Sequence, residues 1–392
     1  MSHNTTISAR ALLLTAFLVA FAICYLYAHS VTLVYGVLEL LIAVVCYAGC
    51  LKQYRTIDGN SLVLGCSAVV LTWCTGLFHG DLKSTLLITV PLLMPLYISS
   101  LKITYKDWTD FVPTTIIAVV ITYLAIEKRA FGQINSNTIG FMGFMGVSIG
   151  VLWIKNAKKR IFPTALVLFG FYCAIRSGSR NVAVVGLLCL VLIFLPKAIL
   201  KKPLVYVSIC LAVMLYSIFT AEILDWIFSE PKLNDLLVEY TDQYSEKTWE
   251  MAGRVEFLEM LQSRIAKRDI LEQLFGTGNY TIHGHNMFLQ CVANFGYIGM
   301  VLVYGMFYRV FKLAYLLIVK KQDDVALGCV IVLWGIFLLQ GADVFVVGHE
   351  TYPVIPQVIM GIILNRYSIF ENDDVETSRV GVCGKILRYV KA

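Results

Sequence analysis

The sequence predicts an all-α, polytopic integral membrane protein with about twelve transmembrane helices and one long outer loop. Of its 392 residues, 58% are hydrophobic and only 15% are charged, whereas soluble domains carry about 25% charged residues. The mean hydropathy is +0.74. Apolar runs of about 17–25 residues, long enough to cross a bilayer, recur along the chain. Together these observations exclude a soluble globular protein.

Each apolar run is expected to form one membrane-spanning helix. The first run is too long for the apolar core of a signal peptide and leads straight into the second, so no cleavable signal peptide is expected. The apolar face of the tenth run continues into YRVFKLAYLLIVKK, so that helix is expected to extend further. The twelve expected spans are 11–29, 31–50, 61–79, 84–101, 109–126, 136–154, 162–176, 180–196, 203–222, 286–308, 325–342 and 351–368.

The positive charges gather on alternate loops, which indicates the orientation of the chain. The loops near 52–55, 102–106, 155–160, 197–202 and 312–321 and the C-terminal tail are rich in Lys and Arg. Cytoplasmic loops carry this excess, so both termini are expected in the cytoplasm. The chain then divides into helices 1–9 (1–222), a long outer loop (223–284), helices 10–12 (285–368) and a cytoplasmic tail (369–392).

The second half of the outer loop has the period of an amphipathic helix. In AGRVEFLEMLQSRIAKRDILEQLF, one face carries Val255, Leu258, Leu261 and Ile265, and the helix is basic. A basic amphipathic helix is typical of a segment that lies on a membrane surface. The stretch GTGNYTIHGHN then returns the chain to the bilayer.

The eleven cysteines are scattered and are expected to act as small packing residues. None forms a CxxC pair, and no His/Cys cluster has the spacing of a zinc site. We therefore expect neither disulfides nor a metal ion, and no cofactor.

Polar groups stand beside apolar spans at four places on the expected outer face. An Arg at a helix end is more often a solvated anchor than a ligand, and a lone interfacial His is usually incidental. The HGHN turn that opens a span after a long loop is less easily explained in this way, and an acid inside a membrane usually pairs with a base. The candidates are Arg176, Arg180, Arg254, His283, His285, Asn286, Asp343 and His349.

The combination of arginines and a histidine favours a lipid-phosphate substrate. Guanidinium forks bind phosphate oxygens bidentately and stay charged. A histidine titrates near neutral pH and accepts a proton from a hydroxyl group. The arginines would stabilise a phosphate leaving group while the histidine activates an attacking hydroxyl. The residues alone do not identify the substrate.

Three motifs resemble the O-antigen ligase and polymerase superfamily, the Wzy/WaaL-type integral membrane glycosyltransferases. They are SGSRNVAVVGLLCLVLIF, MAGRVEFLEML and LFGTGNYTIHGHNMFLQCVANFGYIG. Their order, the long outer loop and the number of spans also agree, and the resemblance covers about 136–367. Members often have an Arg a few residues beyond the acidic residue of span eleven, whereas this chain has His349 after Asp343. Arg176 and His283 match none of the motifs.

The resemblance implies glycan transfer at the outer face of the bacterial inner membrane, without a metal. The donor would be an oligosaccharide on undecaprenyl pyrophosphate, and the acceptor another lipid-linked repeat unit, with a chain-length regulator as a further partner. By motif, Arg180 and Arg254 would bind the pyrophosphate and His285 would be the general base. Arg176, His283, Asn286, Asp343 and His349 are secondary substrate-binding candidates. No nucleic acid partner is expected.

Other functions stay open at this point. A ligase would transfer the glycan to lipid A–core, and an oligosaccharyltransferase of the same superfamily would transfer it to protein. A transporter of lipid-linked glycans would show inverted repeats, Gly- or Pro-broken helices in matching halves and charges at mid-membrane. The sequence shows no inverted repeat and no broken helices in matching halves, and its charges gather on one face rather than at mid-membrane. We favour a polymerase over a ligase, because the outer loop is compact and its FGTGNYTIHGHN turn resembles that branch of the superfamily more closely.

Overall fold

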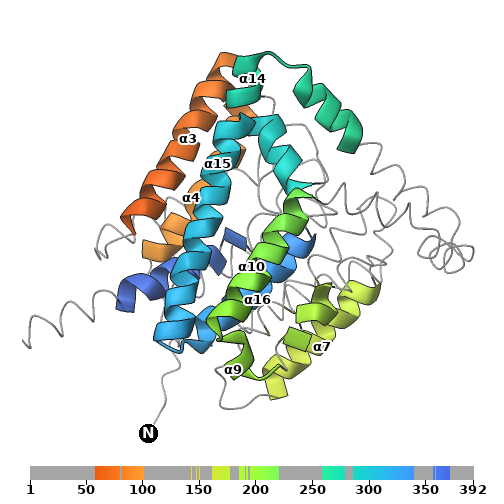
Figure 1. The fold of residues 1–392 in the computed structure, drawn as a ribbon, viewed down its shortest axis with the longest axis vertical. Coiled ribbons are helices and arrows are strands. Elements are labelled where there is room, and N and C mark those ends of the chain that lie inside the picture. The colour runs from red at the N-terminus through yellow and green to blue at the C-terminus, as the bar shows by residue number, and fades with distance from the viewer. Residues whose placement is uncertain are drawn as a thin grey trace, which may run out of the picture.

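The computed structural model describes thirteen stretches of the chain, and these are helical almost throughout. The described residues are 58–79, 82–100, 143, 147, 150, 161–176, 185–189, 191–192, 195–219, 258–278, 286–339, 356–357 and 359–370. No strand occurs among them. The all-α class predicted from the sequence is therefore confirmed for the described part of the chain (Figure 1).

The helices occupy several of the positions expected for spans. Two further helical segments cover 258–266 and Ile359–Phe370. Among the described residues, two helical stretches are long and apolar enough to cross a membrane by length and composition: Gly59–Phe78 and Met287–Lys320, which Gly296 interrupts. The bounds are α3 Gly59–His79, α4 Leu82–Ser100, α7 Ile161–Arg176, α9 Lys197–Leu200, α10 Pro203–Ile218, α14 Ile270–Phe275, α15 Met287–Tyr315, the π-helix η3 Leu316–Lys320 and α16 Asp324–Leu339.

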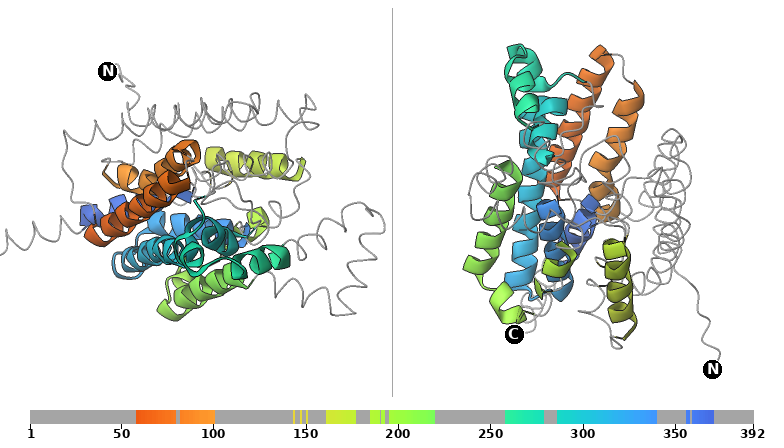
Figure 2. Two further views of the ribbon diagram at one scale, coloured as in Figure 1. Left: turned by 90° about the horizontal axis from the view of Figure 1, so that it is seen from above. Right: turned by 90° about the vertical axis from the view of Figure 1, so that its right-hand side faces the viewer.

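Helix α15 lies at the centre of the bundle and contacts α3, α10, α14 and α16. Its continuation into η3 confirms that the tenth helix extends beyond residue 308. The ring of Phe307 meets Phe337 of α16 edge to face, with centroids 4.6 Å apart. On the other side, the Tyr206 hydroxyl of α10 donates to the Phe311 carbonyl at 2.8 Å. Figure 2 shows α10 and α7 on opposite sides of the bundle, with α16 between them.

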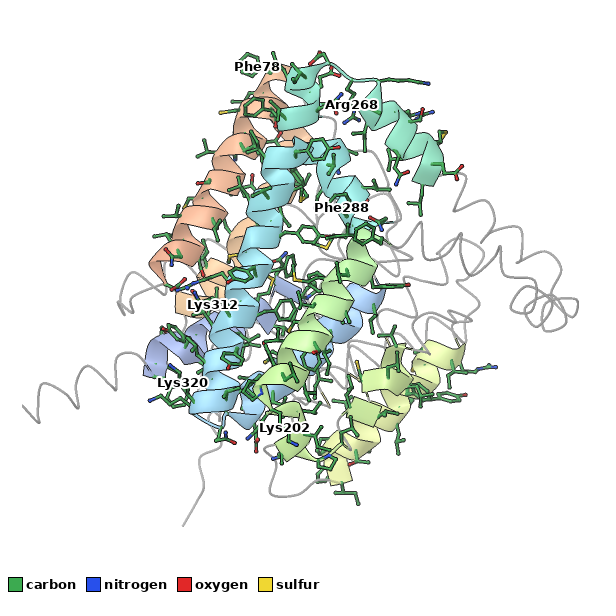
Figure 3. All side chains as sticks on the ribbon, in the orientation of Figure 1. Phe78, Lys202, Arg268, Phe288, Lys312 and Lys320 are labelled. Atoms are coloured by element: carbon green, nitrogen blue, oxygen red, sulfur yellow. The ribbon has the colours of Figure 1, made fainter. Side chains whose placement is uncertain are left out.

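Ion pairs join helices in the part of the molecule away from α14. We call this part the basic end, because Lys202 and Lys320 lie there, opposite Phe78 and Arg268 (Figure 3). The pairs are Asp58 with Arg309, Asp323 with Arg366, and Asp324 with both Lys197 and Lys201. Each links segments at least 43 residues apart in sequence.

Candidate functional site

Helix α15 is broken at Gly296, and the chain reverses its direction there. Gly296 has φ 69° and ψ −177°, which is not helical. Phe288 and Tyr304 are 16 residues apart, so a straight helix would separate them by about 24 Å. Their ring centroids are nevertheless 6.1 Å apart. The first arm, 287–295, therefore folds back along the second arm, 297–315, and the expectation of one continuous helix over 286–308 is wrong.

Two glycines allow the backbones of α14 and α15 to touch at this reversal. Gly276 follows α14 with φ 82°, and a Cβ atom there would lie closer than 3.0 Å to the backbone of Asn294. A Cβ atom at Gly296 would lie equally close to the backbone of Leu274. Residues with a side chain disfavour these positive φ values, and neither position has space for a Cβ atom. We call the two arms of α15 the hairpin and residues 258–278 the loop segment. The contact between the glycines fixes the loop segment to the hairpin (Figure 1).

The helix 258–266 covers one face of the first arm. Its Leu258, Leu261 and Ile265 are at most 4% exposed and form one cluster with Leu289 and Val292. The apolar face predicted from the sequence is confirmed for these three residues, while Val255 lies outside the described residues. The expectation that this face lies on a membrane surface is wrong, because it packs against the protein.

Arg268 stabilises the end of the first arm. Its Nη1 donates to the carbonyl oxygen of Ala293 at 2.7 Å. The last carbonyls of a helix have no partner within the helix, so this bond satisfies one of them. Burial lowers the pKa of the Arg268 guanidinium, and the carboxylate of Glu272 opposes this shift. The group still carries its charge at neutral pH, because an arginine pKa lies far above 7.

Asn286 begins the first arm as its N-cap. Its backbone is extended, with φ −144° and ψ 128°, and its Oδ1 accepts a hydrogen bond from the Leu289 N–H at 2.9 Å. Such a cap satisfies one of the free N–H groups at a helix start. Asn286 is 1% exposed. The structure thus gives it a structural role, and its binding of substrate stays a prediction.

The first arm carries a polar face between its two apolar faces. Met287 and Phe295 belong to the core of the bundle. The polar face consists of Asn286, Gln290 and Asn294, which follow one another at intervals of four residues and therefore lie one above the other. All three are at most 1% exposed. A helix buried inside an apolar bundle therefore has three amide side chains along one side.

Asn294 differs from the other two amides of the polar face. It is fully buried, and neither its side-chain oxygen nor its nitrogen has a hydrogen-bond partner in the described structure. Asn286 caps the arm, and Gln290 also has a partner. Buried polar groups in proteins are nearly always hydrogen-bonded, so an amide without a partner requires an explanation.

Of the residues predicted for the site, the structure describes two. Arg176 is the exposed last residue of α7, and Asn286 starts the first arm. These two lie on separate elements, and the assembly of the whole set stays a prediction. The other six lie outside the described residues: Arg180, Arg254, His283, His285, Asp343 and His349.

The sequence interpretation missed Gln290, Asn294 and Arg268 as residues of this region. A signal was present for the amides, because HNMFLQCVAN places polar residues four and eight positions after Asn286 within an apolar stretch. No comparable signal marked the bond from Arg268 to a backbone carbonyl. In the described part of the chain, no three His, Cys, Asp or Glu side chains lie close enough together to share a metal ion.

The comparisons with known proteins identify no relative. No family model matches the chain, and no curated protein matches it. The site must therefore be interpreted from its own structure. It consists of the hairpin, the amides on the polar face of the first arm, and the loop segment that packs against the hairpin.

Proposed function

We propose that the chain is a polytopic membrane glycosyltransferase of the O-antigen polymerase type. It transfers a glycan from undecaprenyl pyrophosphate to a sugar hydroxyl of a second lipid-linked repeat unit at the outer face of the bacterial inner membrane. Its termini are cytoplasmic, and the α14 end faces outward. The proposal combines the resemblance of the three motifs with the geometry of the hairpin.

The surface of the helices supports a membrane location. Large apolar side chains point away from the bundle on α10, where Leu204, Leu211 and Leu215 are 79%, 55% and 51% exposed. Extended apolar surfaces of this kind mark contact with lipid or with another protein. The lysines of the basic end fit the cytoplasmic face of such a protein.

The buried first arm with its polar face is the observation that carries the proposal. It starts at Asn286, the residue directly after His285, and amides line one side of it for its whole length. Polar residues inside an apolar bundle are costly and usually serve a function. The polar face thus begins one residue after His285, the predicted general base, where a polar substrate is required.

The reaction needs three groups of this chain. Arg180 and Arg254 bind the pyrophosphate and stabilise its charge as it leaves. His285 accepts the proton of the acceptor hydroxyl while that oxygen forms a bond to the anomeric carbon of the donor. The bond from this carbon to the phosphate oxygen breaks, and undecaprenyl pyrophosphate leaves with the electron pair. No metal takes part in this scheme.

Three alternatives differ from it by acceptor or by class. A ligase would use lipid A–core as the acceptor and the same donor residues, and a third enzyme of the superfamily would use protein. A transporter is favoured by one observation, the break of α15 at Gly296, because transporters use discontinuous helices. Among the described helices, however, Gly296 is the one residue with non-helical angles inside a helix, and no matching break occurs.

The test uses the purified full chain in nanodiscs, supplied with undecaprenyl-pyrophosphate repeat units with or without lipid A–core. A ladder of products from the repeat units alone identifies a polymerase, and transfer only with lipid A–core identifies a ligase. Product in neither case favours transport. His285→Ala, Arg180→Lys and Arg254→Lys should abolish transfer, since Lys keeps the charge but loses the bidentate fork.

Arg264 provides a matched control for Arg254. It is exposed on the helix 258–266, so Arg264→Lys should leave transfer unchanged. All variants should reach the membrane in wild-type amounts. Full activity in the His285, Arg180 and Arg254 variants together would contradict the assignment of the site.

A further inference from the structure

The starting point is the amide of Asn294, which is buried without a hydrogen-bond partner in the described structure. An amide side chain has two donor hydrogens and an accepting oxygen. Removing these groups from water without replacing their hydrogen bonds is unfavourable, so a protein retains such a residue at a cost in stability. The most direct explanation is that a ligand makes these bonds.

The position of Asn294 indicates how such a ligand would lie. It shares the polar face with Gln290 and Asn286, and eight residues of helix separate Asn294 from Asn286, a rise of about 12 Å. This is the length of a short oligosaccharide rather than of a single small ion. A ligand along the polar face would extend from the residue after His285 toward the crossing of Gly276 and Gly296.

The chemistry of the polar face selects the class of ligand. Between 287 and 295 the arm has no charged residue. Phosphates are bound by cationic side chains or arrays of N–H groups, and metal ions by carboxylates, so neither fits these neutral amides. An amide that donates and accepts at once matches a hydroxyl group, which also does both. Adjacent amides on one helix face therefore suit a neutral, polyhydroxylated ligand.

We propose that the polar face is a glycan subsite and that Asn294 is a specificity-determining residue in it. Resting on the proposed function, this inference assigns to the first arm the recognition of the sugar, which is separate from the binding of pyrophosphate by the arginines. The sugar belongs either to the donor or to the acceptor, and both have the same hydroxyl chemistry.

Asn365 offers a matched control for Asn294, because it is also a buried asparagine on an apolar helix. Its Nδ2 donates to the Ser99 carbonyl at 2.7 Å. Asn365→Leu removes a bond that exists in the fold and should lower the midpoint of thermal unfolding. Asn294→Leu removes an amide without partners at nearly equal volume, so the midpoint should stay the same or rise. A merely structural Asn294 would behave like Asn365.

The experiment measures three properties of the wild type, Asn294→Leu and Asn365→Leu in nanodiscs. These are the thermal midpoint, the rate of transfer, and binding of three probes: undecaprenyl pyrophosphate without sugar, the lipid-linked repeat unit, and the oligosaccharide released from it. For Asn294→Leu we expect unchanged binding of the bare lipid and at least tenfold weaker transfer. If Asn294→Leu no longer binds the lipid-linked repeat unit more tightly than the bare lipid, the bound sugar belongs to the donor. If the variant loses only its affinity for the released oligosaccharide, the bound sugar belongs to the acceptor.

The outcomes separate this inference from the proposed function. If the wild type transfers glycan and Asn294→Leu matches it in transfer and in sugar binding, the subsite is overturned while the enzyme stands. A thermal midpoint that falls as far as in Asn365→Leu also overturns it. If the wild type transfers nothing, the proposed function fails. Binding of the released oligosaccharide then decides the subsite. The subsite is supported if the wild type and Asn365→Leu bind the oligosaccharide and Asn294→Leu does not. It is overturned if the wild type does not bind the oligosaccharide.

Discussion

The two ends of the molecule hold their helices together by different means. At the basic end, side chains of opposite charge join distant segments, as in the pair of Asp58 and Arg309. At the α14 end, the backbones themselves meet where Gly276 and Gly296 cross, and Arg268 bonds to a backbone carbonyl. Among the described residues, ion pairs thus join distant segments at the basic end, whereas a contact of backbones and a bond to a backbone carbonyl join them at the α14 end.

This difference separates structural from functional use of polar groups. The carboxylates of the basic end pair with cationic side chains, as Asp324 does with Lys197 and Lys201. Near α14 the amide of Asn294 is fully buried and has no hydrogen-bond partner in the described structure, and two glycines bring backbones into contact. A region held by its backbone can leave its polar side chains available for binding.

The largest effect is expected from Gly296→Ala, which tests the backbone contact. The new Cβ would collide with the backbone of Leu274 at an unfavourable φ, so the free energy of unfolding should fall by about 4 kcal/mol or more. Thermal unfolding of the purified protein measures this. Gly305→Ala is the control, because its Cβ would meet only the Leu64 side chain at 3.3 Å, and we expect almost no change. Equal stability of the two variants would contradict the hairpin.

A somewhat smaller effect is expected from Asp58→Asn, which tests the charge pairing. Arg309 donates from Nε to Asp58 at 2.9 Å, and the two side chains are 17% and 8% exposed. Removal of one partner leaves a largely buried charge without its partner, so the free energy of unfolding should fall by about 3 kcal/mol. Replacing both residues, as in Asp58→Asn with Arg309→Gln, should recover part of this loss. A double variant as unstable as the sum of both single variants would refute the coupling.

The same pair predicts a dependence of stability on pH. Burial by itself raises the pKa of Asp58, but the hydrogen bonds from Arg309 and Ser61 outweigh it, and the pKa lies below its usual value. The carboxylate therefore contributes its full stability above about pH 4, the value of an unfolded aspartate, and loses it as pH falls through the lowered pKa. Unfolding measured against pH should show this acid loss in the wild type and a smaller one in Asp58→Asn.

The smallest effect is expected from Arg268→Met, which removes one charged bond and keeps much of the apolar stem. The carbonyl of Ala293 loses its donor, so the free energy of unfolding should fall by about 1–2 kcal/mol. Hydrogen exchange should increase at the end of the first arm and not at α3. Unchanged exchange there would mean that the glycine contact alone fixes the arm.

The sequence was sufficient to predict the helical class and the local patterns. The apolar period of Leu258, Leu261 and Ile265 and the extension of the tenth helix were both predictable, because each depends on neighbours within a few turns. The surface against which that apolar face packs was not predictable, because a membrane and a protein bury it equally well.

The reversal at Gly296 and the long-range ion pairs could not be predicted. Glycine is common in apolar helices, so a single glycine does not indicate a turn. Its left-handed φ becomes necessary only through the contact with Gly276, which lies twenty positions earlier. Asp58 and Arg309 are 251 residues apart, and no local pattern connects them. Six of the eight predicted site residues lie outside the described residues, and the roles of Arg180, Arg254 and His285 still depend on the motifs.

The reversal also sets the direction of the electric dipole of the first arm. A helix carries about half a positive elementary charge at its start and half a negative one at its end. Here the negative end lies at the reversal, where the guanidinium of Arg268 faces it. The positive end lies at Asn286, which is 1% exposed, so water weakens its field little. An anion that reaches the start of the arm is stabilised there, and this is the sign of charge that a departing pyrophosphate carries.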